Sequence, residues 1–173
     1  MKTLDDLVAE IRAAGGEAHA FTCDVTDSSS VEHTVKDILG QFGHVDYLVN
    51  NAGRSIRRSV SASTDRLHDY ERVMAVNYFG SVRMVLALLP HWRERRFGHV
   101  VNVSSAGVQA NSPKYSAYLP TKAALDAFSS SRGTVALGAV AREAGVGIGI
   151  AGVLEATSVT DTINSMTPTL ASM

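Results

Sequence analysis

Apolar residues recur every three or four positions in two stretches near the start of the chain, residues 4–11 and 31–42. This spacing places their side chains on one face of a helix. Thr3 and Asp6 have the capping-box spacing expected at the start of the first helix, and glycines follow both stretches. The chain is therefore predicted to begin with two amphipathic helices.

Short apolar runs alternate with the helical stretches and predict β-strands. They cover residues 18–25, 45–49, 99–105 and 146–150. Strands that alternate with helices along a chain usually form a parallel sheet, with the helices packed against its faces. The pattern therefore predicts an α/β fold with a doubly wound parallel sheet.

Two further helices are predicted after residue 64. Residues 65–89 have the apolar spacing of one continuous helix, which Pro90 is expected to close or kink. Another helix is predicted over residues 116–128. Residues 129–134 are rich in serine and contain a glycine, which disfavours a helix, and residues 136–144 can resume it.

The composition is that of one ordinary globular domain, residues 1–173, with 45% hydrophobic residues and enough length to bury a core. The net charge of −1 argues against a nucleic-acid binder, which would have a basic excess. Cys23 is the only cysteine, so no internal disulfide can form, and the histidines lack metal-ligand spacing. No apolar run reaches the ~20 residues of a membrane span. We expect a metal-free cytoplasmic protein with small-molecule partners.

The candidate chemistry lies at the end of the third predicted strand and in the helix that follows it. Tyr118 and Lys122 are four residues apart, so on a helix the phenol and the ammonium share one face. A phenol titrates near ~10, and a neighbouring cation lowers that pKa toward the range of a useful acid or base. Ser105 ends the strand, where its hydroxyl can hold the oxygen that Tyr118 protonates. Alone, the Tyr–Lys spacing fits equally well a half-buried ring beside a solvated amine.

Other motifs precede this group and change its interpretation. Together they resemble the short-chain dehydrogenase/reductase family over residues 1–128, and most of all the reductase domain of bacterial fatty-acyl-CoA reductases. The residues that carry the resemblance, in the family's order, are Asp24-Val25, Asn50-Asn51-Ala52-Gly53, Asn77, Ser105, Tyr118 and Lys122.

The resemblance implies four catalytic residues. Tyr118 exchanges a proton with the substrate oxygen, and Ser105 holds that oxygen. Lys122 tunes Tyr118 and binds the nicotinamide ribose. Asn77 distorts its helix and holds a water that extends the proton relay. Asn77 lies in an apolar stretch, where an unpaired amide would be costly, so we also expect it to have a hydrogen-bond partner.

The resemblance also implies cofactor contacts from the earlier motifs. Asp24 and Val25 would contact the adenine ring, and Asn50, Ala52 and Gly53 would lie along the adenosine side, with Tyr118 and Lys122 at the nicotinamide end. An alternative for Asp24 is a turn aspartate that caps the next helix, a role that Asp27 or Ser28 could fill instead. The asparagine-glycine segment can also be an ordinary turn, or its asparagines can tie neighbouring strand ends together.

Two features near these motifs have ordinary alternatives. Arg54, Arg57 and Arg58 lie in a serine-rich loop and can hold a phosphate of the cofactor or of a carrier-linked substrate, although exposed loop arginines are common. Tyr115 has Leu119 rather than a lysine four residues on, and it is not at the family spacing from the strand-end serine. We therefore do not assign Tyr115 the catalytic role.

The sequence departs from the family pattern at both ends. A dinucleotide-binding fold begins with a strand, a glycine-rich turn and a helix N-terminus that receive the pyrophosphate, and none of these precedes Thr3. By the family's order, the first and second strands are missing. In the sheet they would lie between the strands predicted at residues 18–25 and 45–49. Where the family has Pro-Gly after a later strand, this sequence has Ala151-Gly152. We therefore expect an incomplete, Rossmann-like reductase domain, truncated at its N-terminus.

The resemblance implies an oxidoreductase that uses NAD or NADP to transfer a hydride to or from a carbonyl or alcohol substrate, with a fatty-acyl or ketoacyl compound as the narrower expectation. The alternative is a truncated, non-catalytic chain that associates with intact subunits. In the family, helices that match residues 65–89 and 116–144 pack between subunits, so we expect a homo-oligomer formed through them. In the alternative, the same helices would pair with intact subunits.

Overall fold

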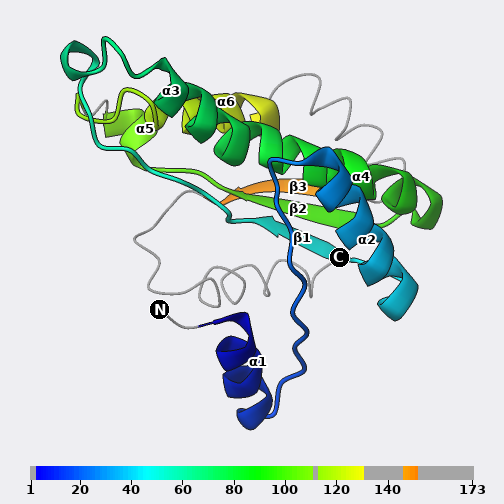
Figure 1. Cartoon of the computed structure of the whole chain (residues 1–173). Helices are drawn as coiled ribbons and strands as arrows, with labels where there is room; N and C mark the ends of the chain where they lie inside the picture. The colour runs from blue at the N-terminus through cyan, green and yellow to red at the C-terminus, as the bar shows by residue number, and fades with distance from the viewer. Residues whose placement is uncertain (1–2, 111–112, 131–145, 152–173) are drawn as a thin grey trace.

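A computed structural model describes residues 3–110, 113–130 and 146–151 (Figure 1). Its elements, in chain order, are α1 (Leu4–Ala13), α2 (Ser28–Phe42), β1 (Tyr47–Asn50), the short 3₁₀ helix η1 (Val60–Ala62), α3 (Leu67–Met74), the π-helix η2 (Ala75–Gly80), α4 (Ser81–Arg95), β2 (Gly98–Val103), α5 (Gly107–Ala110), α6 (Leu119–Ser130) and β3 (Val146–Ala151).

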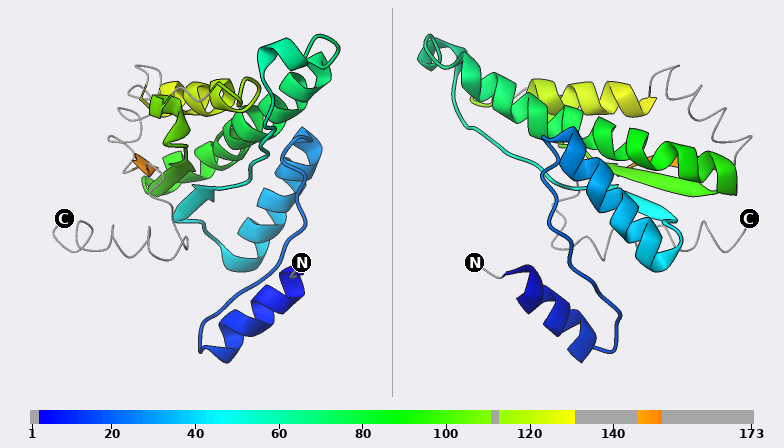
Figure 2. Two further views of the ribbon diagram at one scale, coloured as in Figure 1. Left: turned by 90° about the vertical axis from the view of Figure 1, so that its left-hand side faces the viewer. Right: turned by 45° about the vertical axis from the view of Figure 1, so that its right-hand side comes forward.

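The three strands form a parallel sheet in the order β1-β2-β3. Asn50 pairs with Asn102 in register, so the carboxyl ends of β1 and β2 reach the same edge of the sheet. The views in Figures 1 and 2 show α2, α4 and α6 over one face of the sheet, while α1 lies apart from that helix layer. The predicted α/β class with a parallel sheet is confirmed.

The core lies between the sheet and the α2–α4 layer. Trp92 is fully buried, and its indole nitrogen donates to the carbonyl of Val45 at 2.8 Å. A Cβ at Gly98 would lie 2.4 Å from the Trp92 ring, so only glycine leaves room for that ring at the start of β2. The buried residues of this core are Val31, Val35, Leu48, Val85, Leu88, Trp92 and Val100.

The predicted long helix is present, and of the two outcomes expected at Pro90, closing the helix is wrong. The helices α3, η2 and α4 form one helical stretch, and Pro90 lies inside α4. Proline cannot donate to the carbonyl four residues back. That residue is Leu86, whose side chain is 55% exposed, so it lies on the side of the helix where water can reach the backbone.

By length and composition, this stretch of 29 residues would also be able to cross a membrane. In the structure its inner face carries Val85, Leu88 and Trp92, which belong to the buried core. The stretch therefore packs as a core helix of the α/β fold.

The predicted strand over residues 18–25 is wrong. This segment runs from α1 to α2 without strand pairing (Figure 1). A β-strand is stabilised by backbone hydrogen bonds to a neighbouring strand. No strand among the described residues lies beside this segment, so its apolar composition alone does not produce a strand.

The first predicted helix is confirmed as α1, with both hydrogen bonds of the capping box between Thr3 and Asp6. The second is confirmed as α2, and Gly43 ends it in a left-handed conformation with φ 77°. No residue of α1 is buried, whereas α2 contributes Val31 and Val35 to the core. Local sequence signals therefore form both helices, but only α2 is held by tertiary packing.

The helix predicted from Ser116 begins at Leu119 as α6 and continues through Ser130. The sequence predicted that residues 129–134 disfavour a helix, but residues 129 and 130 are helical. The Ser129 hydroxyl donates to the carbonyl of Leu125 at 2.8 Å, a bond within the helix itself. Residues 131–145, where the helix was expected to resume, lie outside the described residues, while the last predicted strand is confirmed as β3.

Candidate active site

Ser105 lies just beyond the end of β2, where the chain leaves the sheet for α5. Its side chain is half-buried, and its hydroxyl oxygen accepts a hydrogen bond from the backbone N–H of Gly107 at 3.2 Å. A serine hydroxyl has one proton to donate and two lone pairs. Because the N–H of Gly107 uses only a lone pair, the proton of Ser105 is available for an oxygen placed beside it.

Tyr118 lies in the turn that precedes α6. Its backbone carbonyl accepts from the N–H groups of Thr121 and Lys122, which form the first turn of the helix. The half-buried tyrosine lines the same hollow as Ser105, and the hollow has a volume of about 300 Å³. The lining residues are Ser55, Ser105, Gly107, Tyr115, Tyr118 and Leu119. The structure therefore brings together the serine and the tyrosine proposed from the sequence.

Lys122 lies on the first turn of α6 and is 4% exposed. Its ammonium donates to the carbonyl of Val103, the last residue of β2, at 2.6 Å. Burial lowers the pKa of Lys122, and the negative charge of Asp126 opposes that effect. A Cβ at Gly53 would lie 3.8 Å from the ammonium, so the lysine also faces the loop after β1.

Asn77 is fully buried in the π-helix η2 and makes the hydrogen bonds that its burial requires. Its side-chain oxygen accepts from the N–H of Arg54 at 2.7 Å, and its amide nitrogen donates to the carbonyl of Arg54 at 2.9 Å. The amide also donates to the hydroxyl of Thr121 at 2.9 Å, and that hydroxyl donates to the carbonyl of Tyr118. The predicted need for a partner is confirmed, and Asn77 links the loop after β1 to the tyrosine segment.

The asparagines at the strand ends tie the sheet to α6. The amide of Asn50 donates to the side-chain oxygen of Asn102 at 2.8 Å, and the amide of Asn102 donates to the hydroxyl of Ser129 at 2.8 Å. This matches the alternative in which asparagines join neighbouring strand ends. Ala52 and Gly53 follow in an exposed loop, close to the buried Lys122 through Gly53.

Asp24 makes the contacts of a turn aspartate. Its carboxylate accepts from the N–H of Thr26 at 2.8 Å and from the hydroxyl of the same residue at 2.7 Å. These hydrogen bonds hold the pKa of Asp24 below its usual value. The cap of α2 is Asp27, which accepts from the N–H of Ser29. Val25 packs against Gly80, whose added Cβ would lie 2.8 Å from it.

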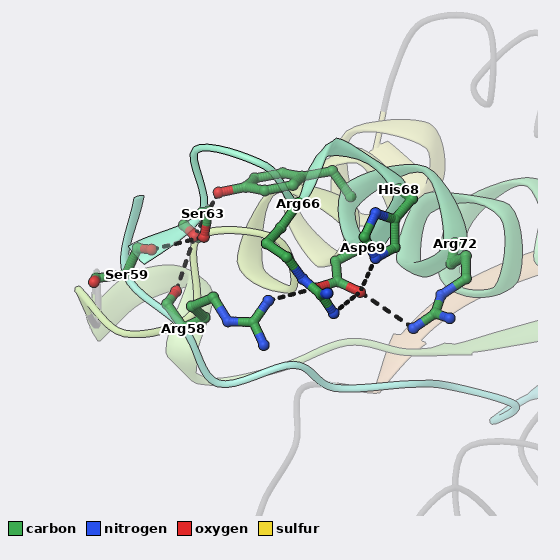
Figure 3. A network of polar contacts seen from close by, with 9 residues as sticks. Arg58, Ser59, Ser63, Arg66, His68, Asp69 and Arg72 are labelled. Atoms are coloured by element: carbon green, nitrogen blue, oxygen red, sulfur yellow. Dashed lines mark hydrogen bonds and ion pairs between the residues drawn. The ribbon is translucent and has the colours of Figure 1, made fainter. Parts of the chain in front are cut away.

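A charged cluster beside the hollow went unnoticed in the sequence (Figure 3). Asp69 on α3 is 2% exposed, and its carboxylate contacts Arg58 at 2.6 Å, Arg66 at 3.0 Å and Arg72 at 3.2 Å. His68 lies 3.4 Å from the same carboxylate. The available signal was the spacing of Arg66 and Arg72, which are three residues before and after Asp69.

The electrostatics of this cluster follow from the surplus of cations. Burial alone would raise the pKa of Asp69, but the hydrogen bond and charge of Arg66, the nearby His68 and the hydrogen bond from Arg58 together hold that pKa below its usual value. Several cations surround one carboxylate, so the cluster as a whole is positively charged.

The position of Tyr115 differs from what its spacing suggested. It is not four residues before a lysine, yet it lines the hollow with Tyr118, and the two ring centroids are 6.1 Å apart. The backbone of Tyr115 forms an isolated parallel bridge with Arg58. Sequence spacing distinguishes the two tyrosines, but only the fold shows that both face the same space.

Comparison with known proteins gives consistent matches. The family model for short chain dehydrogenase matches residues 1–159. A fatty acyl-CoA reductase from Acinetobacter baylyi is 52% identical over 128 residues, which cover 74% of this chain and 43% of that protein. The chain thus spans less than half the length of this curated relative.

Solved structures give the same match at the level of the fold. A short-chain dehydrogenase from Streptomyces avermitilis has a TM-score of 0.73 and 35% identity, covering 87% of this chain and 53% of that one. An NAD⁺-bound xylitol dehydrogenase has a TM-score of 0.74 and 27% identity, covering 86% of this chain and 54% of that one. In both cases this chain covers about half of the solved chain.

Proposed function

The chain belongs to the short-chain dehydrogenase family, and from this premise we propose that it takes part in hydride transfer between a nicotinamide cofactor, NAD or NADP, and a carbonyl or alcohol substrate. The observation that carries the proposal is the shared hollow of Ser105 and Tyr118, with Lys122 one helical turn beyond Tyr118. Had these side chains faced different surfaces, the chemistry would have no site.

The described residues fit the nicotinamide end of such a cofactor. Lys122 uses one of its three N–H donors on Val103, so two remain for ribose hydroxyls. Gly53 has no side chain, and the space where a Cβ would stand lies between the loop, Asn77 and Lys122. When bound there, the nicotinamide would supply or accept the hydride. No glycine-rich turn that receives a pyrophosphate occurs within the described ranges.

Each side chain has a specific role in this proposal. Tyr118 gives a proton to the substrate oxygen during reduction, or takes it during oxidation. Ser105 donates its free hydroxyl proton to the same oxygen and so stabilises the negative charge that develops there. Lys122 is held by the carbonyl of Val103 and faces the loop after β1, where its remaining N–H donors would bind the ribose.

Asn77 acts as a positioning residue in this scheme. Its bonds to Arg54 fix the loop that would lie along the cofactor, and its bond to Thr121 fixes the backbone carbonyl of Tyr118. The family resemblance implies in addition that Asn77 holds a water that extends the proton relay. Asp24, Val25, Asn50 and Ala52 remain proposed contacts of the adenosine half.

For the substrate we propose a fatty-acyl compound, because the Acinetobacter baylyi relative is a fatty acyl-CoA reductase. Aromatic and aliphatic side chains from Tyr115 and Leu119 line the hollow beside Tyr118, which suits a carbonyl attached to an alkyl chain. We further propose a homo-oligomer formed through the helical stretch α3–η2–α4 and through α6. Their exposed apolar side chains include Leu67, Phe79 and Leu86.

The test is Tyr118→Phe in the full chain, with Tyr115→Phe as the matched control. Both substitutions remove one phenol oxygen from the same hollow. We expect Tyr118→Phe to lower kcat for reduction of a long-chain aldehyde by about 10²–10⁴, while Tyr115→Phe stays close to the parent. Nicotinamide oxidation followed by absorbance measures both. Equal rates for the parent and Tyr118→Phe would refute the assigned role.

Titration with NADH and NADPH separates this function from the alternative of a non-catalytic chain that pairs with intact subunits. Saturable binding by the purified chain, weakened by Lys122→Met, supports the oxidoreductase. Absence of binding, together with co-purification of a second subunit, would favour the alternative.

A further inference from the structure

The arginines of the loop after β1 differ in what holds them. The side chain of Arg58 is bound to the buried Asp69 at 2.6 Å. Arg57, its neighbour in sequence, is exposed and contacts no carboxylate among the residues that the structure describes. One arginine of the pair therefore anchors the loop, and the other keeps an uncompensated charge.

The anchor fixes the loop against the segment that carries the two tyrosines. The carbonyl of Arg58 accepts from the hydroxyl of Ser116 at 2.9 Å, and the backbone of Arg58 bridges to Tyr115. The hydroxyl of Ser116 also bonds to that of Tyr70 at 2.8 Å. These contacts hold the backbone on both sides of the hollow, so the neighbouring Arg57 extends from a fixed point.

Arg57 contacts one of the tyrosines that line the hollow. Its guanidinium carbon is 5.9 Å from the centroid of the Tyr115 ring, a cation–π arrangement that orients the planar group. Tyr115 in turn lines the hollow beside Tyr118. A guanidinium that rests on a ring still presents its N–H edge to a ligand, and that edge matches the oxygens of a phosphate or carboxylate.

We propose that Arg57 binds an anionic phosphate group of the substrate whose reacting oxygen lies in the hollow. The inference rests on the proposed function and narrows its substrate class to acyl compounds carried on a phosphorylated thioester handle. The positive cluster around Asp69 includes Arg58 of the same loop and adds to the attraction for an anion.

Arg57 would instead bind a phosphate of the cofactor if it lay beside the residues proposed to hold the cofactor. The side chains proposed for the nicotinamide end are Lys122 and Asn77, which lie with Gly53. Arg57 contacts Tyr115, and Tyr115 lines the hollow of Ser105, where the substrate oxygen is placed. The contact therefore assigns Arg57 to the substrate.

The first experiment measures binding without turnover. Coenzyme A alone is titrated by calorimetry into the full chain, into Arg57→Gln and into Arg93→Gln. Arg93 lies in the last turn of α4, so its loss changes the net charge equally at a site remote from the hollow (Figure 1). We expect Arg57→Gln to weaken binding about five- to tenfold and Arg93→Gln to leave it unchanged. Equal weakening by both variants, or no binding by the parent chain, would overturn the proposal.

The second experiment distinguishes substrate phosphate from cofactor phosphate. Arg57→Gln should raise the KM for a long-chain acyl-coenzyme A about five- to tenfold. The KM for the same acyl group on N-acetylcysteamine, which carries no phosphate, should not change. Binding of NADPH should not change. Weakened NADPH binding with unchanged coenzyme A binding would refute the assignment to the substrate. Coenzyme A binding through Arg57 without any hydride transfer would refute the proposed function and retain the anion site.

Discussion

Two buried polar clusters hold the same loop by different means. In the amide cluster, Asn77 binds the backbone of Arg54 and the hydroxyl of Thr121. In the carboxylate cluster, Asp69 binds the side chains of three arginines, one of which is Arg58 from the loop. Asn77 and Asp69 are 0% and 2% exposed and belong to one helical stretch. The two clusters thus attach residues four apart in the loop to the same helix.

The difference lies in what each cluster does to the electrostatics of the hollow. The amide of Asn77 satisfies both backbone groups of Arg54 without adding a charge, so the ammonium of Lys122 is the cation next to that part of the loop. The carboxylate of Asp69 needs cations to offset its burial, and it gathers more positive charge than it carries. Neutral bonds thus hold the part of the loop near the proposed proton chemistry, and charges hold its outer part.

Removing the amide should have the largest effect. Asn77→Ala leaves the N–H and carbonyl of Arg54 without their partner and removes the donor to the hydroxyl of Thr121. We expect the free energy of unfolding to fall by about 2–4 kcal/mol, and kcat to fall at least tenfold in the activity assay. Chemical denaturation measures the first quantity.

Asn51→Ala is the control for this substitution, because Asn51 is exposed and its backbone N–H, which the substitution leaves in place, donates to the carbonyl of Val49. It should change the stability little. If Asn77→Ala were as stable as Asn51→Ala, the amide would not hold the loop.

Removing the carboxylate should have a smaller effect that depends on pH. The pKa of Asp69 is lowered in the folded protein. A lowered folded pKa means that the stabilisation is present above the unfolded pKa, near ~3.9, and is lost as the pH falls through the folded value. Asp69→Asn should therefore lower the Tm at pH 7 and approach the parent at pH 3. High salt should narrow the difference at pH 7.

Glu71→Gln, exposed on the same helix, provides the matched loss of one negative charge. Thermal unfolding followed by circular dichroism from pH 3 to pH 7 compares the three proteins. A constant Tm difference between Asp69→Asn and the parent at every pH would contradict an ionic role for this cluster.

Removing a hydrogen bond that belongs to neither cluster should have the smallest effect on the free energy of unfolding. The hydroxyl of Ser116 donates to the carbonyl of Arg58 and bonds to that of Tyr70. Ser116→Ala should cost about 0.5–1.5 kcal/mol, with little dependence on pH or salt. The exposed Ser61→Ala is the control in denaturant titrations. A loss as large as that of Asn77→Ala would show that Ser116, rather than the amide, fixes the loop.

Much of the fold could be predicted because its signals are local. The capping box of Thr3 and Asp6 and the glycine after Phe42 mark helix ends that the structure shares. The strands around Leu48 and Val100 follow from short apolar runs. Local signals failed where a partner decides the outcome. Residues 18–25 have a strand-like composition, but they form no strand, because no described strand lies beside them.

The candidate site divides in the same way. Spacing and order singled out Ser105, Tyr118 and Lys122, and the fold brings the first two to one hollow and the third to the adjacent strand end. Spacing also showed that the buried Asn77 needs a partner, but not which one. Asp69 went unnoticed because its third arginine, Arg58, reaches it from a loop whose path the sequence does not reveal.

By itself, the sequence determined most of the helices and strands, the family of the fold and the residue types needed for proton transfer, because each of these depends on short-range spacing and residue chemistry. The tertiary structure alone decided that Asn77 bonds to Arg54, that Asp69 is surrounded by arginines and that Arg57 rests on Tyr115. Those contacts join separate segments. They depend on the path of the backbone between the segments, which residue spacing does not encode.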